Sequence, residues 1–268
     1  MPAPIITLLT DFGLKDTYVA SMKGAILTVC PEARLIDISH LVPPQDVRTG
    51  AFLLASVYHD FPSGTIHLVV IDPGVGTARR GLVIEMDRHL FVGPDNGLFS
   101  WVLRDTSTWE AFSLENPAFW RPTVSKTFHG RDIFAPVAGH LALGLAPRAL
   151  GPPCTPQMAS WASAVETGEE IRGEIIYIDN FGNAVTNVSS EMIAHFAPGS
   201  RIAVRIGGLS LSRVFDTYGD QELGVVMALV GSSRRLEIAI NQGRAAEICG
   251  LHCGDPVSIV RKDDVSDE

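Results

Sequence analysis

The sequence predicts two domains: an α/β domain over residues 1–150 with a Rossmann-like, mainly parallel sheet, and a smaller all-β barrel over residues 169–268. Three observations predict this division. In the first half, short apolar runs alternate with helical patterns, as in parallel strands joined by crossover helices. In the second half, short strand-like runs are separated by glycine or polar turns. A proline-rich stretch, residues 151–168, lies between the halves and is predicted to be a linker.

Composition agrees with two domains and excludes two classes of partner. A chain of 268 residues with 46% hydrophobic residues can bury one large core or two smaller ones. Its 21 basic and 30 acidic residues give a net charge of -9. Nucleic acids and anionic membranes need a basic face on the protein, so we expect neither as a partner. A small-molecule partner fits this composition better.

Targeting and redox signals are weak. Residues 1–12 lack the basic and apolar regions of a secretion signal, and no run approaches the roughly 20 apolar residues of a membrane span. We therefore expect a cytoplasmic protein. The four cysteines are too few and too scattered for a disulfide framework. Cys249, His252 and Cys253 resemble part of a metal site, but no second ligand pair completes it, and we expect no metal.

The elements of the N-terminal domain follow from hydrophobic periodicity and helix punctuation. Strands are expected at 5–11, 34–39 and 64–72, with helices at 16–31 and 46–61. Asp16 is the expected N-cap of the first helix, and Pro31 ends it. Two more strands at 81–87 and 89–93, a short helix at 97–104 and a longer helix at 131–144 follow. Asp132 lies near the positive N-terminal end of that last helix.

The C-terminal domain is predicted to be built from short strands. They are expected at 173–179, 201–208, 224–231, 234–241 and 255–262, with one short helical piece at 189–197. Because these runs are joined by tight turns rather than helices, we expect a small barrel or sandwich.

Two acids follow predicted parallel strands. Asp11 closes the first strand, and Asp72 closes the third within the stretch VVIDPGVGTARRG, residues 69–81. Ligands of open α/β sheets bind beyond the carboxyl ends of the strands, so both acids are expected to face one crevice. Each acid alone is as well explained as a cap of a turn or helix. Gly74 and Gly76 have neither dinucleotide nor phosphate-loop spacing, and no nucleophile elbow is present.

Each of two further polar clusters has both a structural and a functional interpretation, and the local sequence does not decide between them. His129 precedes a predicted helix start in KTFHGRDIFAP, where a single histidine is more often structural. Asp179 and three asparagines surround Phe181 in YIDNFGNAVTN, and these residue types are ordinary turn formers. The functional alternative is a platform that stacks on a planar base and hydrogen-bonds it.

Five stretches together resemble the S-adenosyl-L-methionine (SAM) hydroxide adenosyltransferases, which are related to enzymes that attack SAM with fluoride or chloride. The stretches are TDFGLKDTYVASMKGAI (10–26), DPGVGTARR (72–80), FVGPDNGLFS (91–100), FHGRDIFAP (128–136) and DNFGNAVTN (179–187). The resemblance implies a homotrimer that binds SAM between the N-terminal domain of one subunit and the C-terminal domain of its neighbour. It also implies hydrolysis of SAM to adenosine and L-methionine, with no cofactor.

The resemblance places a water-activating triad on Asp72, Arg79 and His129. The arginine follows the aspartate by seven residues, although Arg80 stands directly beside it. Halogenating relatives have tyrosine in place of the aspartate, so Asp72 favours water over halide. An aspartate has a reference pKa near 3.9 and water about 15.7, so Asp72 cannot generate hydroxide beforehand. We expect the triad to orient a water, with His129 as the eventual proton acceptor.

The resemblance also assigns substrate-binding residues. Asp11 matches the aspartate that holds the ribose hydroxyls, a task that suits a carboxylate because it accepts two hydrogen bonds. Asp179, Phe181 and Asn183 match the segment that contacts the methionine and adenine moieties. The adenine-binding strand region matches residues 231–241, where the candidates are Ser232, Ser233 and Glu237. The family commonly has Gly-Tyr where this chain has Arg234-Arg235.

Two other functions compete with hydrolysis. A SAM-dependent halogenase would form 5′-haloadenosine, and the aspartate at position 72 argues against it. A non-catalytic sensor of SAM or adenosine would have no need of Asp72, Arg79 and His129 together.

Overall fold

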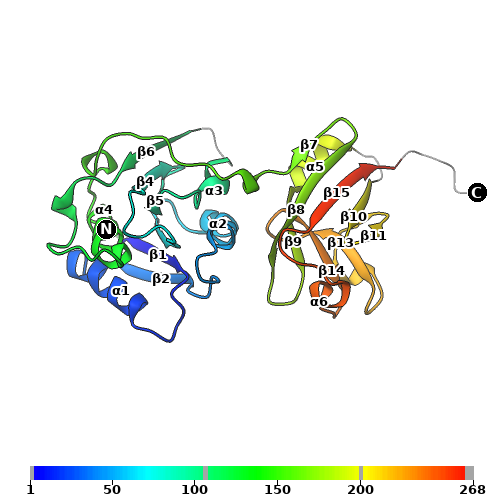
Figure 1. Cartoon of the computed structure of the whole chain (residues 1–268), viewed down its shortest axis with the longest axis horizontal. Coiled ribbons are helices and arrows are strands. Elements are labelled where there is room, and N and C mark those ends of the chain that lie inside the picture. Colours follow the sequence, from blue (N-terminus) through cyan, green and yellow to red (C-terminus); the bar gives the residue numbers. More distant parts are fainter. Residues whose placement is uncertain (1–2, 105–107, 199–201, 263–268) are drawn as a thin grey trace, which may run out of the picture. The chain divides into compact units, whose positions relative to one another are not determined.

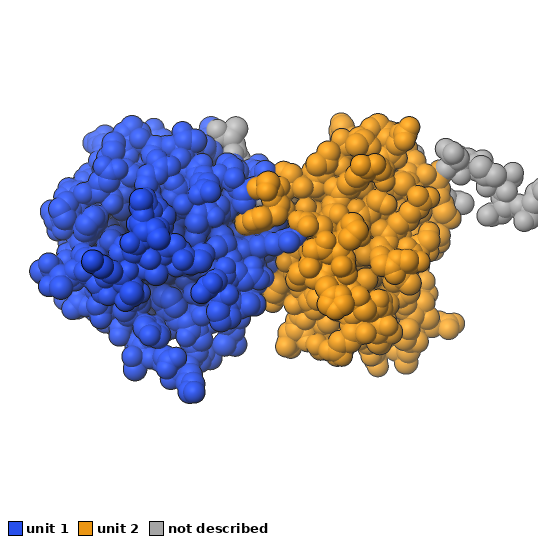
Figure 2. Space-filling view, viewed as in Figure 1, with its two compact units in different colours: residues 1–159 blue, residues 160–268 orange. Residues whose placement is uncertain are grey.

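The computed structural model describes residues 3–104, 108–198 and 202–262 of the chain. The chain divides into two compact units, residues 1–159 and 160–268 (Figure 2). Each unit contains its own cluster of buried hydrophobic side chains. The expected two-domain fold class is therefore confirmed, although both units differ from the expectation in detail.

The first unit contains a six-stranded mixed sheet in the order β2-β1-β3-β5-β4-β6 (Figure 1). Its strands are β1 (Ile5–Thr10), β2 (Arg34–Ser39), β3 (Ile66–Val70), β4 (Gly81–Met86), β5 (His89–Pro94) and β6 (Trp109–Ser113). The pairs β1–β2, β1–β3 and β3–β5 are parallel, whereas β4 is antiparallel to β5 and β6. A mainly parallel, Rossmann-like sheet is thus only partly confirmed. Asp87 and Arg88 form a two-residue turn with positive φ, which can join only antiparallel strands.

Helices cover both faces of this sheet. Figure 1 shows α1 (Tyr18–Val29) beside α4 (Ala135–Ala142) on one face, and α2 (Val47–Ala55) with α3 (Ser100–Arg104) on the other. Gly139 permits the close approach of α4 to α1, because a Cβ at this position would lie 2.8 Å from the Val29 Cβ. Short 3-10 turns lie between these elements at η1 (Tyr58–Asp60), η2 (Pro117–Phe119) and η4 (Pro147–Ala149).

Two helix starts differ from the prediction. The first helix begins after Thr17 rather than at Asp16, and its N-cap makes no side-chain hydrogen bond. The predicted helix at 131–144 begins with a π-helical turn, η3 (Gly130–Phe134), before α4. Such turns are frequent at functional sites.

Part of the predicted linker is fixed by hydrogen bonds within the first unit. The buried Asp95 carboxylate accepts the N–H of Gln157 at 2.7 Å and binds the Arg80 guanidinium. Arg80 also donates to the carbonyl of Thr155 at 3.0 Å. Residues 155–157 therefore lie against the first unit, and the second unit begins at residue 160.

The second unit is built around one curled sheet in the order β11-β10-β15-β8-β9-β14-β13-β12, and β7 pairs with β8 outside this order (Figure 1). Its strands are β7 (Val165–Glu166), β8 (Glu170–Ile178), β9 (Ala184–Ser189), β10 (Ile202–Ile206), β11 (Leu209–Leu211), β12 (Val214–Phe215), β13 (Val226–Val230), β14 (Arg235–Ile240) and β15 (Pro256–Arg261). Because β12 also contacts β10, the sheet forms a nearly closed barrel. The unit is not strictly all-β, since it carries the short helices η5 (Ser160–Ala162), α5 (Ser190–Phe196), η6 (Tyr218–Asp220) and α6 (Ala245–Cys249).

Candidate active site

The carboxyl ends of β1 and β3 lie beside each other because these strands are parallel neighbours, with Thr10 paired to Val70. Asp11 follows β1 directly, and Asp72 lies two residues beyond the end of β3. Both acids line one cavity of about 340 Å³. The two carboxylates therefore share one crevice at this edge of the sheet.

Arg79 joins Asp72 to His129 at this cavity. The Arg79 Nε donates to both carboxylate oxygens of Asp72, at 2.8 and 3.0 Å, and its Nη2 contacts Oδ2. The same Nη2 donates to the Nδ1 of His129 at 2.8 Å. Asp72 and Arg79 are nearly buried, with side-chain exposures of 5% and 11%. The three side chains therefore form one connected polar group, sheltered from solvent.

The turn that carries Asp72 depends on glycine. The carbonyl of Asp72 accepts the N–H of Val75 at 3.2 Å, and Gly76 adopts a φ of 77°. A Cβ on Gly76 would lie 2.3 Å from the carbonyl oxygen of Lys126. Only a residue without a side chain fits here, and the turn is consequently packed against the segment that leads to His129.

The contact with Arg79 fixes the tautomer of His129. A guanidinium has only donors, so the Nδ1 of His129 must accept and neutral His129 carries its hydrogen on Nε2. Burial and the Arg79 charge lower the pKa of His129, partly opposed by Asp72 and Asp132. His129 is therefore a neutral N–H donor at physiological pH.

Asp11 lies in the same cavity beside an aromatic wall. Its Oδ2 accepts the N–H of Gln45 at 2.7 Å. Burial raises its pKa, as does the charge of Asp72, while the hydrogen bond from Gln45 opposes the rise. Phe12 packs edge-on against Phe128 with ring centroids 5.8 Å apart, and both rings line the cavity. The cavity thus combines carboxylates with apolar walls.

A second cavity, of about 500 Å³, lies in the second unit beside the turn that follows β8. The Oδ1 of Asp179 accepts the N–H groups of Phe181 and Asn183, at 2.9 and 2.8 Å. Its Oδ2 accepts from the Asn183 side-chain amide at 2.9 Å. This bonding shapes the turn, and Phe181, which lines the cavity, is 73% exposed. Asn183 and Tyr218 also line it.

Glu237 connects to this cavity through Tyr218. The Tyr218 hydroxyl donates to Glu237 Oε2 at 3.4 Å and lies 3.5 Å from the Asn183 amide nitrogen. Glu237 is 7% exposed. Burial and the charge of Asp179 raise its pKa to about 6, although the Tyr218 hydrogen bond opposes the rise.

Four of the predicted residues do not line this cavity: Asp179, Glu237, Ser232 and Ser233. Asp179 and Glu237 contact residues that do line it, Asn183 and Tyr218. Ser232 and Ser233 lie in the turn that joins β13 and β14, and neither is among the residues that line the cavity. The Ser233 hydroxyl is buried and makes no hydrogen bond within the described part of the chain.

Comparison with known proteins identifies the family. Sequence models of the SAM hydroxide adenosyltransferase N-terminal and C-terminal domains match residues 6–151 and 173–258. The chain belongs to the SAM hydroxide adenosyltransferase family. A relative named (R)-S-adenosyl-L-methionine hydrolase from Thermus thermophilus is 40% identical over 266 residues, covering 95% of this chain and 99% of the relative. A relative with the same name from Salinispora tropica is 37% identical, covering 96% and 98%.

The chain is also similar to a more distant relative and to two solved structures. A fluorinase from Nocardia brasiliensis is 25% identical and covers 96% of both chains. A crystal structure described as an uncharacterized conserved protein from Thermotoga maritima has a TM-score of 0.87 at 35% identity, covering 96% of this chain and all of the other. A conserved hypothetical protein from Thermus thermophilus has a TM-score of 0.78 at 38% identity, with the same coverage.

The geometry distinguishes the two adjacent arginines, Arg79 and Arg80. Arg79 contacts Asp72 and His129, whereas Arg80 pairs with Asp95 and is 46% exposed. No sequence motif points to Tyr218, which links Asn183 to Glu237. Its only local signal is a single aromatic ring in the polar run between β12 and β13.

Across residues 3–104, 108–198 and 202–262, no group of three or more histidine, cysteine, aspartate or glutamate side chains is arranged to hold a metal ion. Among the same residues, no helix has the length and apolar character to cross a membrane.

Proposed function

We propose that this chain hydrolyses SAM to adenosine and L-methionine, and that it uses the epimer with the R configuration at sulfur. The observation that carries the proposal is the Arg79 side chain, which joins Asp72 to His129 beside Asp11. Family membership supports this substrate, as do the relatives named (R)-S-adenosyl-L-methionine hydrolase at 37–40% identity.

The substrate supplies its own leaving group. Methionine departs from the sulfonium as a neutral thioether, so C5′ is open to in-line displacement by water. The enzyme must hold the water and C5′ in line and keep other water away. Such orientation can lower a barrier by up to about 7–11 kcal/mol.

The triad positions the water and receives its proton. We propose that the water donates a hydrogen bond to Asp72 and accepts one from the Nε2–H of His129. As the C5′–O bond forms, the C5′–S bond breaks and its electron pair leaves with methionine. The water proton moves to Asp72 during this step and passes to solvent afterwards.

We therefore propose Asp72 as the proton acceptor, rather than His129, which the sequence favours. The Nδ1 lone pair of His129 is already occupied by the N–H of Arg79. Burial and the Arg79 charge both lower the pKa of His129, which makes a protonated ring unfavourable. Asp72 carries the negative charge in the group and has acceptor capacity beyond its contacts with Arg79.

The remaining polar and aromatic groups bind the substrate. Asp11 accepts the ribose hydroxyls, with one carboxylate oxygen already oriented by Gln45. The exposed Phe181 ring stacks on adenine, a contact worth about 1–3 kcal/mol per base. Asp179 and Asn183 contact the substrate beside this ring.

The negative charge of Glu237 and Asp179 complements a cationic sulfonium substrate and does not suit an anionic one. Ser232 and Ser233 are proposed as adenine contacts from the family resemblance. Because the proposed contacts come from both units of the chain, we propose the homotrimer that the family implies, with each site shared between two subunits.

Identification of the nucleoside product tests the proposal. Purified protein is incubated with each sulfonium epimer of SAM, with and without chloride, and products are separated by chromatography. We expect adenosine from the R epimer in both buffers, and a loss of at least about 100-fold in Asp72→Asn. A 5′-chloroadenosine product would support a halogenase, and bound but unchanged SAM would support a sensor. Either result would refute the hydrolase assignment.

A further inference from the structure

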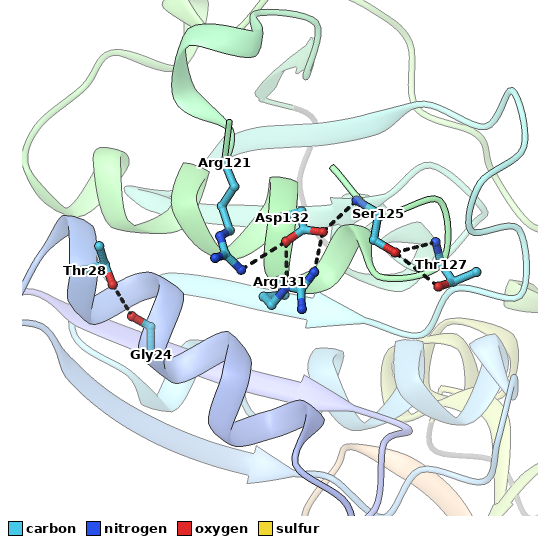
Figure 3. Close-up of polar contacts among 7 residues, drawn as sticks. All are labelled: Gly24, Thr28, Arg121, Ser125, Thr127, Arg131 and Asp132. Atoms are coloured by element: carbon cyan, nitrogen blue, oxygen red, sulfur yellow. Dashed lines mark hydrogen bonds and ion pairs between the residues drawn. The ribbon is translucent and has the colours of Figure 1, made fainter. Parts of the chain in front are cut away.

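Asp132 is a buried charged residue that the proposed reaction does not use directly. It lies in η3, three residues after His129, and its side chain is fully buried. Figure 3 shows Arg121, Ser125 and Arg131 gathered around its carboxylate. It is not among the residues that line the cavity of about 340 Å³. Its role must therefore be exercised through its neighbours.

The carboxylate of Asp132 is held by charge-assisted hydrogen bonds on both oxygens. Arg131 donates to Oδ1 through Nε at 2.6 Å and to Oδ2 through Nη2 at 2.8 Å. The backbone N–H of Ser125 donates to Oδ2 at 2.8 Å, and Arg121 reaches Oδ1 at 3.4 Å. Burial alone would raise the pKa of Asp132, but these hydrogen bonds and the two arginine charges lower it overall. The group is ionised and oriented.

The hydrogen bond to Ser125 connects Asp132 to the His129 loop, which comprises residues 124–129. The Ser125 hydroxyl accepts the N–H of Thr127 at 3.2 Å, a contact also drawn in Figure 3. The N–H of Asp132 itself donates to the Phe128 carbonyl at 3.2 Å. Thr127, Phe128 and His129 all line the cavity. The carboxylate of Asp132 thus holds this loop at Ser125, and its backbone N–H holds the loop at Phe128.

The same loop supports the turn that carries Asp72. Gly76 packs so closely on the Lys126 carbonyl that a Cβ would lie 2.3 Å from its oxygen. A displacement of Lys126 would consequently change the packing of residues 72–79. A displacement of His129 would break its 2.8 Å hydrogen bond to Arg79.

We infer that Asp132 is a positioning residue: its buried carboxylate fixes residues 124–129, and through them it sets the places of His129 and of the turn 72–79. The kinetic consequences of this inference rest on the proposed function. The structural consequence, a loop ordered by one carboxylate, does not.

The test compares Asp132→Asn with Asp95→Asn as a matched control. Both aspartates are buried, bind an arginine and accept a backbone N–H, but Asp95 holds Gln157 rather than the His129 loop. Asparagine keeps the size of the side chain and removes its charge. In the full chain, rates of adenosine formation give kcat and KM, and hydrogen–deuterium exchange follows peptides 122–129 and 155–159.

We expect Asp132→Asn to lower kcat about 10–100-fold, because small displacements of catalytic groups have effects of this order. KM should change less than about threefold, and exchange in 122–129 should become faster. The Asp132 charge raises the pKa of His129, so its removal in Asp132→Asn should lower this pKa. The acidic limb of the kcat–pH profile should therefore move to lower pH. Asp95→Asn should keep the wild-type kcat and speed exchange only in 155–159.

Equal kcat values in the two variants, or unchanged exchange in 122–129, would overturn the inference. If Asp132→Asn does not fold, Ser125→Pro removes the N–H that Asp132 accepts and keeps the carboxylate with both arginines. A wild-type kcat in that variant would also overturn it, and a lowered kcat would support it. A wild-type protein that forms no adenosine refutes the proposed function instead, and the exchange comparison then decides the inference alone.

Discussion

Replacing Arg79 by lysine keeps a positive charge at the site and removes the planar group that joins Asp72 to His129. Arg79 places three N–H contacts on Asp72 and one on His129. A lysine ammonium cannot span both partners, so at least two contacts are lost. Each charge-assisted hydrogen bond contributes about 1.5–3 kcal/mol, so the loss is about 3 kcal/mol at the lower bound. That value corresponds to a decrease in kcat of about 100-fold.

The assay is the initial rate of adenosine release at saturating SAM, with Arg80→Lys as the matched control. Arg80 is adjacent in sequence but binds Asp95, outside the cavity. We expect Arg80→Lys to keep kcat within about twofold of wild type, because Arg80 binds Asp95 and the Thr155 carbonyl rather than Asp72 or His129. An Arg79→Lys variant with at least half of the wild-type kcat would refute the reasoning. Equal losses in both variants would refute it as well.

Three other predictions concern packing, pH and binding. Gly76→Ala should lower both the melting temperature and kcat, because its Cβ would lie 2.3 Å from the Lys126 oxygen, and a wild-type melting temperature would contradict this packing. Burial and a neighbouring histidine lower the pKa of His67 from 6.5 to about 3, so the folded state keeps this ring neutral. The unfolded chain takes up a proton at this histidine below pH 6.5. The folded state should therefore lose stability as the pH falls from 6.5 toward 3. Denaturant titrations should show that the free energy of unfolding falls by up to about 1.4 kcal/mol per pH unit in this window. This slope should be smaller in His67→Leu and unchanged in His59→Gln, a control at an exposed site. Identical slopes in wild type and His67→Leu would contradict the prediction. Phe181→Ala should raise the KM for SAM about 5–150-fold with a smaller effect on kcat, and an unchanged KM would remove this ring from the binding site.

Much of the N-terminal fold could be predicted because its parallel strands are buried and its helices are amphipathic. The ranges expected for β1, β2 and β3 overlap the observed strands closely. The sequence pattern does not reveal the order in which strands pair, so the antiparallel hairpin of β4 and β5 and the edge strand β6 were not anticipated. Helix starts were also imprecise, because Asp16 has a capping residue type but makes no cap.

The site could be predicted where its residues follow strand ends or family motifs. Asp11 and Asp72 meet because parallel neighbours end at the same edge of a sheet. Tyr218 could not be found in this way, because its contact with Asn183 joins positions 35 residues apart. The tautomer of His129 likewise depends on a distance to Arg79 that no sequence pattern contains.

In the proposed reaction, water oriented by Asp72 and its partners attacks C5′ itself. A single turnover in ¹⁸O-labelled water, with enzyme in excess over SAM, tests this step. We expect all adenosine formed in this first turnover to carry heavy oxygen at the 5′ position, as measured by mass spectrometry. Unlabelled adenosine would contradict it, because the oxygen would then have come from an enzyme carboxylate through a covalent intermediate.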